Sequence, residues 1–153
     1  MKAEDIFNYC VSNLDDVVLT DNWGERGIFY NPNGVLKKGV YVLTIKEKDG
    51  INDKSSSLNR TNVYRVNVKL KKETFINMFD YIPKRPSAGQ IVNMDFDFTK
   101  MDIIMPHPVY AWMTWVCVLN PSEKTFEELK IIIQESYNLA KEKFAKRIKS
   151  NSI

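Results

Sequence analysis

Hydrophobic and polar residues follow one another in a pattern that predicts a mixed α+β fold. Val109 to Leu119 is apolar on both alternations, so we expect it to be the central strand, covered on both faces. Tyr64 to Leu70 alternates apolar with polar residues, which indicates a half-buried strand. The polar side of that strand includes Arg65, which is expected to meet solvent or to line a pocket.

The N-terminal third predicts one helix and three strands. Ala3 to Leu14 has apolar residues at three- and four-residue spacing, which indicates a helix packed on the sheet. Val17 to Thr20 and Ile28 to Tyr30 flank the polar turn Asp21 to Gly27, an arrangement typical of a hairpin. The β-branched and aromatic run Val40 to Glu47 predicts a third strand.

Two more helices are predicted further along the chain. Glu73 to Ile82 has helical spacing and is followed by Pro83, which stops a helix. Thr125 to Glu128 has the form of a capping box, so a long helix is expected to start there and to reach about Ile148. Ser150 to Ile153 is expected to fray. The apolar stripe of the long helix, which predicts docking on a sheet, consists of Phe126, Leu129, Ile133, Tyr137, Ala140 and Phe144.

Two segments have no clear periodicity. Lys46 to Asn62 is the longest polar stretch, so the chain must leave the sheet there. Pro83 to Met105 is the least patterned, with Asp95 to Phe98 as a short edge strand. Taken together, the pattern predicts a single α+β domain over residues 1–149. Its antiparallel sheet has about five strands, and the N- and C-terminal helices pack on it.

Composition narrows the possible classes of protein. With 153 residues, 44% of them hydrophobic, the chain can form one domain with a sizeable core. It lacks both an apolar run long enough for a membrane helix and the pattern of a secretory signal, so we expect a cytoplasmic protein without a membrane partner. Cys10 and Cys117 are expected to be buried thiols. Two cysteines and one histidine do not make a spaced ligand set, so we predict no metal and no cofactor.

The net charge of +3 is concentrated near the C-terminus. Lys141 to Lys149 contains five basic residues and one acidic residue. Basic residues at a helix C-terminus favour the helix dipole, so a solvated helix end is the simpler interpretation. The alternative is nucleic-acid binding, with phosphate contacts from Lys143, Lys146, Arg147 and Lys149.

The only histidine, His107, lies between Pro106 and Pro108, which stiffen the chain and fix the imidazole in one place. Its ordinary pKa lies near physiological pH, so a small enzyme with His107 as acid or base is one hypothesis. No partner residue stands at a recognisable spacing from it. A structural hydrogen-bonding role is therefore the alternative.

The polar excursion contains the other candidate site residues. Asp49 to Asp53 lacks the spacing of a calcium loop and is better explained as a turn with side-chain caps. If the excursion folds back over the sheet near His107, it would form a polar cleft with aromatic walls, typical of a small-ligand site. The predicted ligand-binding residues are Trp23, Glu25, Asp49, Asp53, Ser56, Arg60, Arg65, His107 and Tyr110. The alternative is an ion-pair network that only holds the loop in place.

Aromatic residues suggest a further possibility, because Trp23, Tyr110, Trp112 and Trp115 could stack nucleic-acid bases. Trp112 and Trp115 are three apart in the predicted strand, so they should point to opposite faces and at least one should lie in the core. The sequence has no glycine-rich phosphate loop, serine elbow or paired-carboxylate motif.

Several short motifs give the chain a resemblance to a known family. The segment His107 to Pro121 reads HPVYAWMTWVCVLNP. With the following motifs it resembles the uncharacterised family catalogued as domain of unknown function 6194: Trp23–Glu25, Tyr30–Pro32, Lys46–Gly50, Asn52–Asp53, Ser57–Arg60 and Arg65. That resemblance implies no assigned activity. More distantly, the order of elements and Glu135 to Tyr137 look like the MmcQ/YjbR-like fold, an α+β domain sometimes compared with DNA-binding double-wing modules.

These observations lead to a functional expectation. The chain is predicted to be a small-ligand-binding domain with a polar and aromatic pocket, whose partner is a small molecule. Nucleic-acid binding through the basic C-terminal helix and catalysis by His107 remain the two alternatives. The sequence leaves the oligomeric state open.

Overall fold

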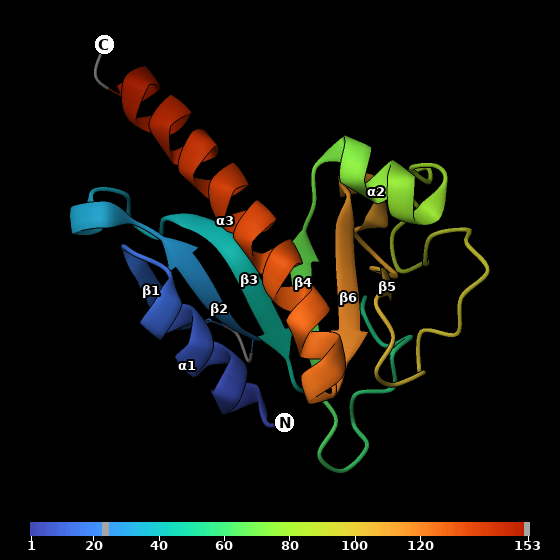
Figure 1. The fold of residues 1–153 in the computed structure, drawn as a ribbon. Helices are drawn as coiled ribbons and strands as arrows, with labels where there is room; N and C mark the ends of the chain where they lie inside the picture. The colour runs from blue at the N-terminus through green and yellow to red at the C-terminus, as the bar shows by residue number, and fades with distance from the viewer. Residues whose placement is uncertain (23–24, 152–153) are drawn as a thin grey trace.

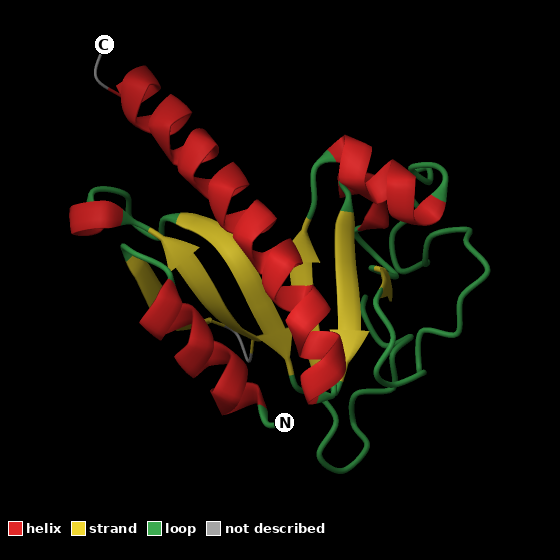
Figure 2. Cartoon of the chain, in the orientation of Figure 1, coloured by secondary structure: helices red, strands yellow, loops and turns green. Residues whose placement is uncertain are grey.

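The structure, a computed structural model, describes residues 1–22 and 25–151. Six strands form one antiparallel sheet in the order β1-β2-β3-β4-β6-β5 (Figures 1 and 2). Their bounds are Val17–Asn22 for β1, Glu25–Tyr30 for β2, Val40–Lys46 for β3, Arg65–Lys69 for β4, Met105–Pro106 for β5 and Trp115–Leu119 for β6. The prediction of an α+β fold with an antiparallel sheet is confirmed, with six strands in place of about five.

One face of the sheet is covered by helices α1 (Ala3–Asn13) and α3 (Glu123–Asn151), as Figure 1 shows. Residues of β2 that point to this face meet both helices. Arg26 pairs with Glu4 and lies over the Phe7 ring of α1, and Tyr30 makes an edge contact with Tyr137 of α3. The predicted docking of both terminal helices on the sheet is confirmed.

Among the described residues, no long helix lies on the opposite face. Over β4, β6 and β5 it is covered by the segments 47–62 and 83–104, which contribute the buried residues Leu58, Val92 and Phe98 to the core. The short helix α2 (Lys72–Phe79) packs at the end of this half (Figure 1). The long polar excursion therefore does fold back over the sheet.

The predicted central strand is correct only in its second half. Ala111–Met113 forms a 3₁₀ turn and Thr114 has φ 65, so the chain becomes extended only at Trp115. The strand β6 that follows is buried on both faces, as predicted, but its neighbours are β4 and the two-residue β5. Trp112 lies in the turn, and both Trp112 and Trp115 are only partly buried. Trp112 packs against the core, in line with the expectation that at least one of these tryptophans lies there.

Other boundaries also differ from the predicted ones. Helix α2 ends at Phe79 because Asp80 takes φ 75, before Pro83 is reached. Helix α3 starts at Glu123, where Ser122 Oγ accepts from the backbone N–H of Thr125 and thereby caps the first turn. It ends at Asn151, two residues into the segment expected to fray. The segment 95–98 forms no strand, and the short edge strand is β5.

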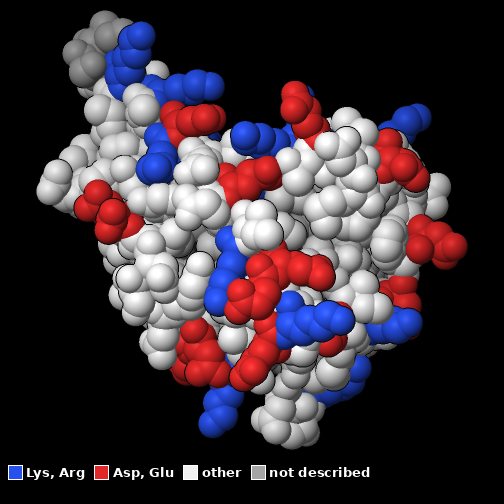
Figure 3. Space-filling model, viewed as in Figure 1, with Lys and Arg blue, Asp and Glu red and all other residues white. Residues whose placement is uncertain are grey.

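Charged residues of both signs are interspersed on the face that carries α1 and α3 (Figure 3). Lysine and arginine prevail only toward the C-terminal end of α3. In the described part of the chain, no helix combines the length and the apolar character that a membrane span requires.

Candidate functional site

A cleft of about 970 Å³ opens on the sheet face opposite the helices. It runs over β2, β3 and β4 to the C-terminal half of α3. Strand β4 pairs with only Leu43–Lys46 of β3, so the two strands diverge beyond Leu43, and there the cleft reaches α3. The residues that line it include Glu25, Phe29, Tyr41, Thr44, Lys46, Asp53, Asn67, Lys69, His107, Tyr110, Trp115, Lys143 and Arg147.

Aromatic side chains form part of the cleft wall. The rings of Phe29 and Tyr41 pack at 4.4 Å between centroids, and Tyr41 makes an edge contact with Trp115 at 6.4 Å. The two strands place these rings together because Phe29 and Tyr41 are register partners, next to a bulge at Ile28/Phe29. Tyr41 is 47% exposed, so its ring is available to a ligand.

Arg65 is buried in the sheet face beside the cleft and is held by four hydrogen bonds. Its Nη1 and Nη2 donate to the two carboxylate oxygens of Asp53 at 2.9 and 2.5 Å. Nη1 also donates to Ser56 Oγ at 2.9 Å, and Nε donates to Asn67 Oδ1 at 2.8 Å. The polar excursion is thus fastened to β4 by a bidentate ion pair with only 1% of the Arg65 side chain exposed.

Asn67 extends this network across the sheet. Its Nδ2 donates to Thr44 Oγ1 at 3.1 Å and lies 3.5 Å from Glu25 Oε1. Arg65 and Asn67 alternate with Val66 and Val68 along β4, so both polar side chains point to the same face. The result is a polar cleft wall that spans β2, β3 and β4.

His107 lies against Arg65, with Nε2 at 3.2 Å from Nη2. Its Nδ1 accepts from the backbone N–H groups of Val109 and Tyr110, each at 3.0 Å. The tight turn that follows the prolines supplies both donors, so the imidazole is held in one orientation. The Tyr110 ring lies 5.0 Å from the imidazole and is 45% exposed at the cleft.

Burial and neighbouring charges shift the pKa values of His107, Arg65 and Lys69. Burial, followed by the charges of Arg65 and Lys46, lowers the pKa of His107 well below its ordinary value of 6.5, so the ring is neutral at pH 7. Burial alone would lower the pKa of Arg65, but the hydrogen bond and charge of Asp53 raise it. Burial, together with Lys143 and Lys72, lowers the pKa of Lys69 at the other end of the cleft.

Six of the nine predicted ligand-site residues come together. Glu25, Asp53, His107 and Tyr110 line the cleft, and Ser56 and Arg65 lie directly behind it. The ion-pair network foreseen as the alternative is present in the same place, as the Arg65–Asp53 pair.

Two predicted site residues instead hold the loops. The Asp49 carboxylate accepts from the Leu58 backbone at 2.7 Å, and Arg60 donates to three carbonyl oxygens, including that of Thr99. The turn interpretation of Asp49 is confirmed. Trp23 lies outside the described residues.

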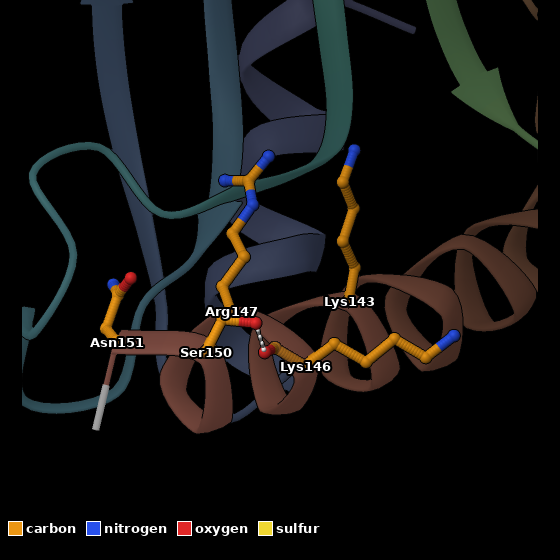
Figure 4. A pocket seen from close by; sticks show the side chains of 5 residues that line it. All are labelled: Lys143, Lys146, Arg147, Ser150 and Asn151. Atoms are coloured by element: carbon orange, nitrogen blue, oxygen red, sulfur yellow. Dashed lines mark hydrogen bonds between the residues drawn. The ribbon is translucent and has the colours of Figure 1, made fainter. Parts of the chain in front are cut away.

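The basic end of α3 forms a shallow pocket of about 280 Å³ lined by Lys143, Lys146, Arg147, Ser150 and Asn151. Figure 4 shows that Lys143 and Arg147 point toward the sheet while Lys146 points in another direction. Arg147 also lies near Gly39, with Nη1 at 3.4 Å from its carbonyl oxygen. These side chains therefore do not form one row along the helix.

The two cysteines are buried, and potential metal ligands do not cluster among the described residues. Cys10 and Cys117 are buried free thiols, and burial raises the pKa of each to about 12. No group of three or more His, Cys, Asp or Glu side chains suited to a metal ion occurs in the described part of the chain.

Sequence reasoning missed Thr44, Lys46, Asn67 and the Phe29–Tyr41 pair as cleft residues. Asn67 could have been predicted as a cleft residue, because it lies on the same polar side of its strand as Arg65. The others depend on the pairing register of β2 and β3, which the alternation within each strand does not provide.

Comparison with curated proteins and with solved structures finds no match to this chain, so the resemblance to the MmcQ/YjbR-like fold is not confirmed. The resemblance to the uncharacterised family is confirmed. A family model matches residues 1–149, and the chain belongs to the family of unknown function DUF6194.

Proposed function

We propose that this protein binds a small polar ligand in the cleft between the open sheet face and the end of α3. One observation carries the proposal. The buried Arg65–Asp53–His107 network lies at the wall of an open cleft, whereas the helix face of β3, β4 and β6 buries only apolar side chains. A buried ion pair is weak support for stability, since apolar residues of similar volume often serve as well. Fixed polar groups beside an aromatic wall are what ligand recognition needs.

The volume and shape of the cleft agree with this use. About 970 Å³ is at the upper end of the range of small-molecule sites. The lining offers rings for stacking, from Tyr41 and Trp115, and donors and acceptors at fixed positions from Thr44 and Asn67. A ligand with an apolar ring and polar substituents fits this combination.

A thermal-shift screen against metabolites, nucleotides and short oligonucleotides tests the proposal. A ligand at a hundred times its Kd stabilises the folded state by about 2.7 kcal/mol, which raises the midpoint by roughly 5 to 10 °C in a chain of this size. Tyr110→Ala should abolish the shift, because the Tyr110 ring lines the cleft.

Tyr81→Ala is the matched control. Tyr81 is 51% exposed, against 45% for Tyr110, and is not among the cleft residues. A shift that survives in both variants would place the ligand elsewhere. The absence of any small-molecule shift across the screen would overturn the proposal.

Nucleic-acid binding by the basic end of α3 is the second candidate, favoured by Lys143, Lys146 and Arg147 around one shallow pocket. It predicts a shift with oligonucleotides only. That shift would fall steeply with salt and would be lost in Lys146→Ala but retained in Tyr110→Ala. Catalysis by His107 predicts that a bound compound is converted, which NMR spectra of the screened mixtures would reveal as new product signals.

A further inference from the structure

Three N–H donors point at the two ring nitrogens of His107. The backbone N–H groups of Val109 and Tyr110 point at Nδ1, and one N–H of Arg65 Nη2 points at Nε2. A neutral imidazole has one N–H and one free lone pair, so it can accept at only one of these nitrogens. The three donors cannot all be satisfied.

The two backbone donors decide the tautomer. A proton on Nδ1 would face two N–H groups at 3.0 Å, whereas a proton on Nε2 faces only one at 3.2 Å. The lone pair therefore lies on Nδ1 and the proton on Nε2. In the described part of the chain, Arg65 is the only hydrogen-bonding partner of Nε2, so the Nε2–H has no acceptor.

The hydrogen bonds of Arg65 also leave one N–H group without an acceptor. Of its five N–H groups, two reach Asp53, one reaches Ser56 and one reaches Asn67. The fifth points at His107. Two N–H groups thus converge without an acceptor, on side chains that are 1% and 2% exposed, and His107 belongs to the cleft lining. Leaving buried donors without an acceptor is costly, which indicates that a ligand completes the site.

We propose that the ligand of the cleft carries an anionic oxygen, as in a carboxylate or phosphate, which accepts from His107 Nε2–H and Arg65 Nη2–H together. This inference rests on the proposed ligand-binding function and names the chemical class of the ligand. The anionic group sits at the His107 end, and the remainder of the molecule extends along the cleft toward the rings of Tyr41 and Trp115.

Charge favours an anion over a neutral acceptor. The cleft lining contains six basic side chains, Lys38, Lys46, Lys69, Lys143, Lys146 and Arg147, and three acidic ones, Glu25, Asp53 and Glu142. Water can also accept from both donors, but hydrogen bonds to an ionised oxygen are about twice as strong. An anion therefore displaces water from this point, and a neutral alcohol gains little by doing so.

Nitrogen-15 NMR of the imidazole tests the first step directly, because His107 is the only histidine and its ring signals need no assignment. At pH 7 we expect a neutral ring with the proton on Nε2. Inorganic phosphate and benzoate, added separately, should shift the Nε2 signal in a saturable way, and benzyl alcohol should not. A proton on Nδ1, or an Nε2 signal that neither anion moves, would overturn the proposal.

His107→Asn sharpens the test, because its side-chain oxygen can still accept from the Val109 and Tyr110 backbone while the Nε2–H is removed. We expect benzoate to bind this variant about tenfold to a hundredfold more weakly, as for the loss of one hydrogen bond to a charged group. Unchanged benzoate affinity would contradict the inference. If His107→Asn does not fold, the NMR measurement on the unaltered protein decides alone.

The two proposals fail in different ways. If only neutral or cationic compounds bind, and Tyr110→Ala abolishes their binding, the cleft is a ligand site but the anionic class is wrong. If no small molecule binds in the cleft, the proposed function fails and the inference fails with it.

Discussion

The two faces of β4 show two different solutions to burial within one strand. Val66 and Val68 point to the helix face and are fully buried among apolar neighbours. Arg65 and Asn67, on the opposite face, are almost as completely buried, but among polar groups. The apolar face is stabilised by removing surface from water, and that gain does not depend on exact partners. The polar face depends on hydrogen bonds between particular partners, so it tolerates fewer substitutions than the apolar face.

The difference follows from what covers each face. Helices satisfy their own backbone groups, so α1 and α3 contact the sheet mainly through apolar side chains. The exceptions include the Arg26–Glu4 ion pair and the hydrogen bond from Ser136 Oγ to the Val42 carbonyl oxygen. The excursion 47–62 is polar and irregular, and its side-chain hydrogen bonds to β4 come from Asp53 and Ser56. Arg65 therefore positions a loop and the cleft wall at the same time.

The largest expected effect is that of Arg65→Ala. The substitution leaves the Asp53 carboxylate, which is partly buried, without its cation and also removes the partners of Ser56 and Asn67. Loss of one member of a buried pair destabilises by about 3–5 kcal/mol. Urea unfolding followed by tryptophan fluorescence measures the change.

A double substitution tests the reason for that loss. Arg65→Met with Asp53→Leu removes both charges and should recover most of the stability, since no unpaired charge remains. If the double variant is as unstable as Arg65→Ala, the charges are not the cause. A loss below about 1 kcal/mol in Arg65→Ala would mean that the polar face contributes nothing that depends on its exact partners.

Leu43→Ala probes the helix face. Leu43 is fully buried, opposite Ile28 and Val68 in the sheet. We expect a loss of about 3 kcal/mol from the missing side-chain atoms and the cavity that remains. Equilibrium unfolding in urea measures this loss of stability. Ligand titration then compares the two faces, because Leu43→Ala should keep ligand affinity whereas Arg65→Ala should lose it. Equal loss of affinity in both variants would erase the distinction between the faces.

The pH dependence of stability offers a smaller, more specific signal. Burial, Arg65 and Lys46 lower the folded-state pKa of His107 well below 6.5, so below pH 6.5 the unfolded chain binds a proton that the folded chain does not. Stability is therefore complete above the unfolded pKa and falls as the pH drops, by about 2 kcal/mol between pH 8 and pH 5. Urea midpoints measured across this range should lose that slope in His107→Asn. A slope that persists in the variant would belong to other groups.

The elements that form the apolar helix face were predicted from the sequence better than those that form the polar face. Periodicity identifies both terminal helices and the hairpin because the apolar spacing is local. It also places Arg65 on the polar side of its strand. It fails for Val109 to Thr114, where an apolar composition suits a strand or a turn equally well, and the φ 65 of Thr114 decides for the turn.

The candidate site divides in the same way. Asp53, Arg65 and His107 were grouped from their chemistry, and the structure brings them within hydrogen-bonding distance. Asp49 and Arg60 have the same chemistry but point at backbone groups of the loops. No local pattern separates the two sets, because the direction of a side chain in an irregular loop depends on contacts between distant segments.

The smallest expected effect on stability is that of Tyr41→Leu. Tyr41 and Leu43 are two residues apart, yet their side chains lie on different faces of the sheet. The bulge between β2 and β3 causes this, because it pairs Tyr41 with Phe29 and Leu43 with Ile28. Tyr41 is 47% exposed, and its main contact is the Phe29 ring. Aromatic pairs of this kind contribute about 0.5–1.5 kcal/mol, and the exposure of Tyr41 puts the expected loss below about 1 kcal/mol.

Ligand affinity should respond in the opposite order. Tyr41→Leu removes a ring from the cleft wall while leaving the sheet intact, so a compound that binds the cleft should bind this variant much more weakly than it binds Leu43→Ala. Urea unfolding and ligand titration of the two variants, side by side, compare both quantities. If Tyr41→Leu proved as destabilising as Leu43→Ala and left affinity unchanged, the open face would be a second core. The polar network behind it would then serve only to hold the loop 47–62.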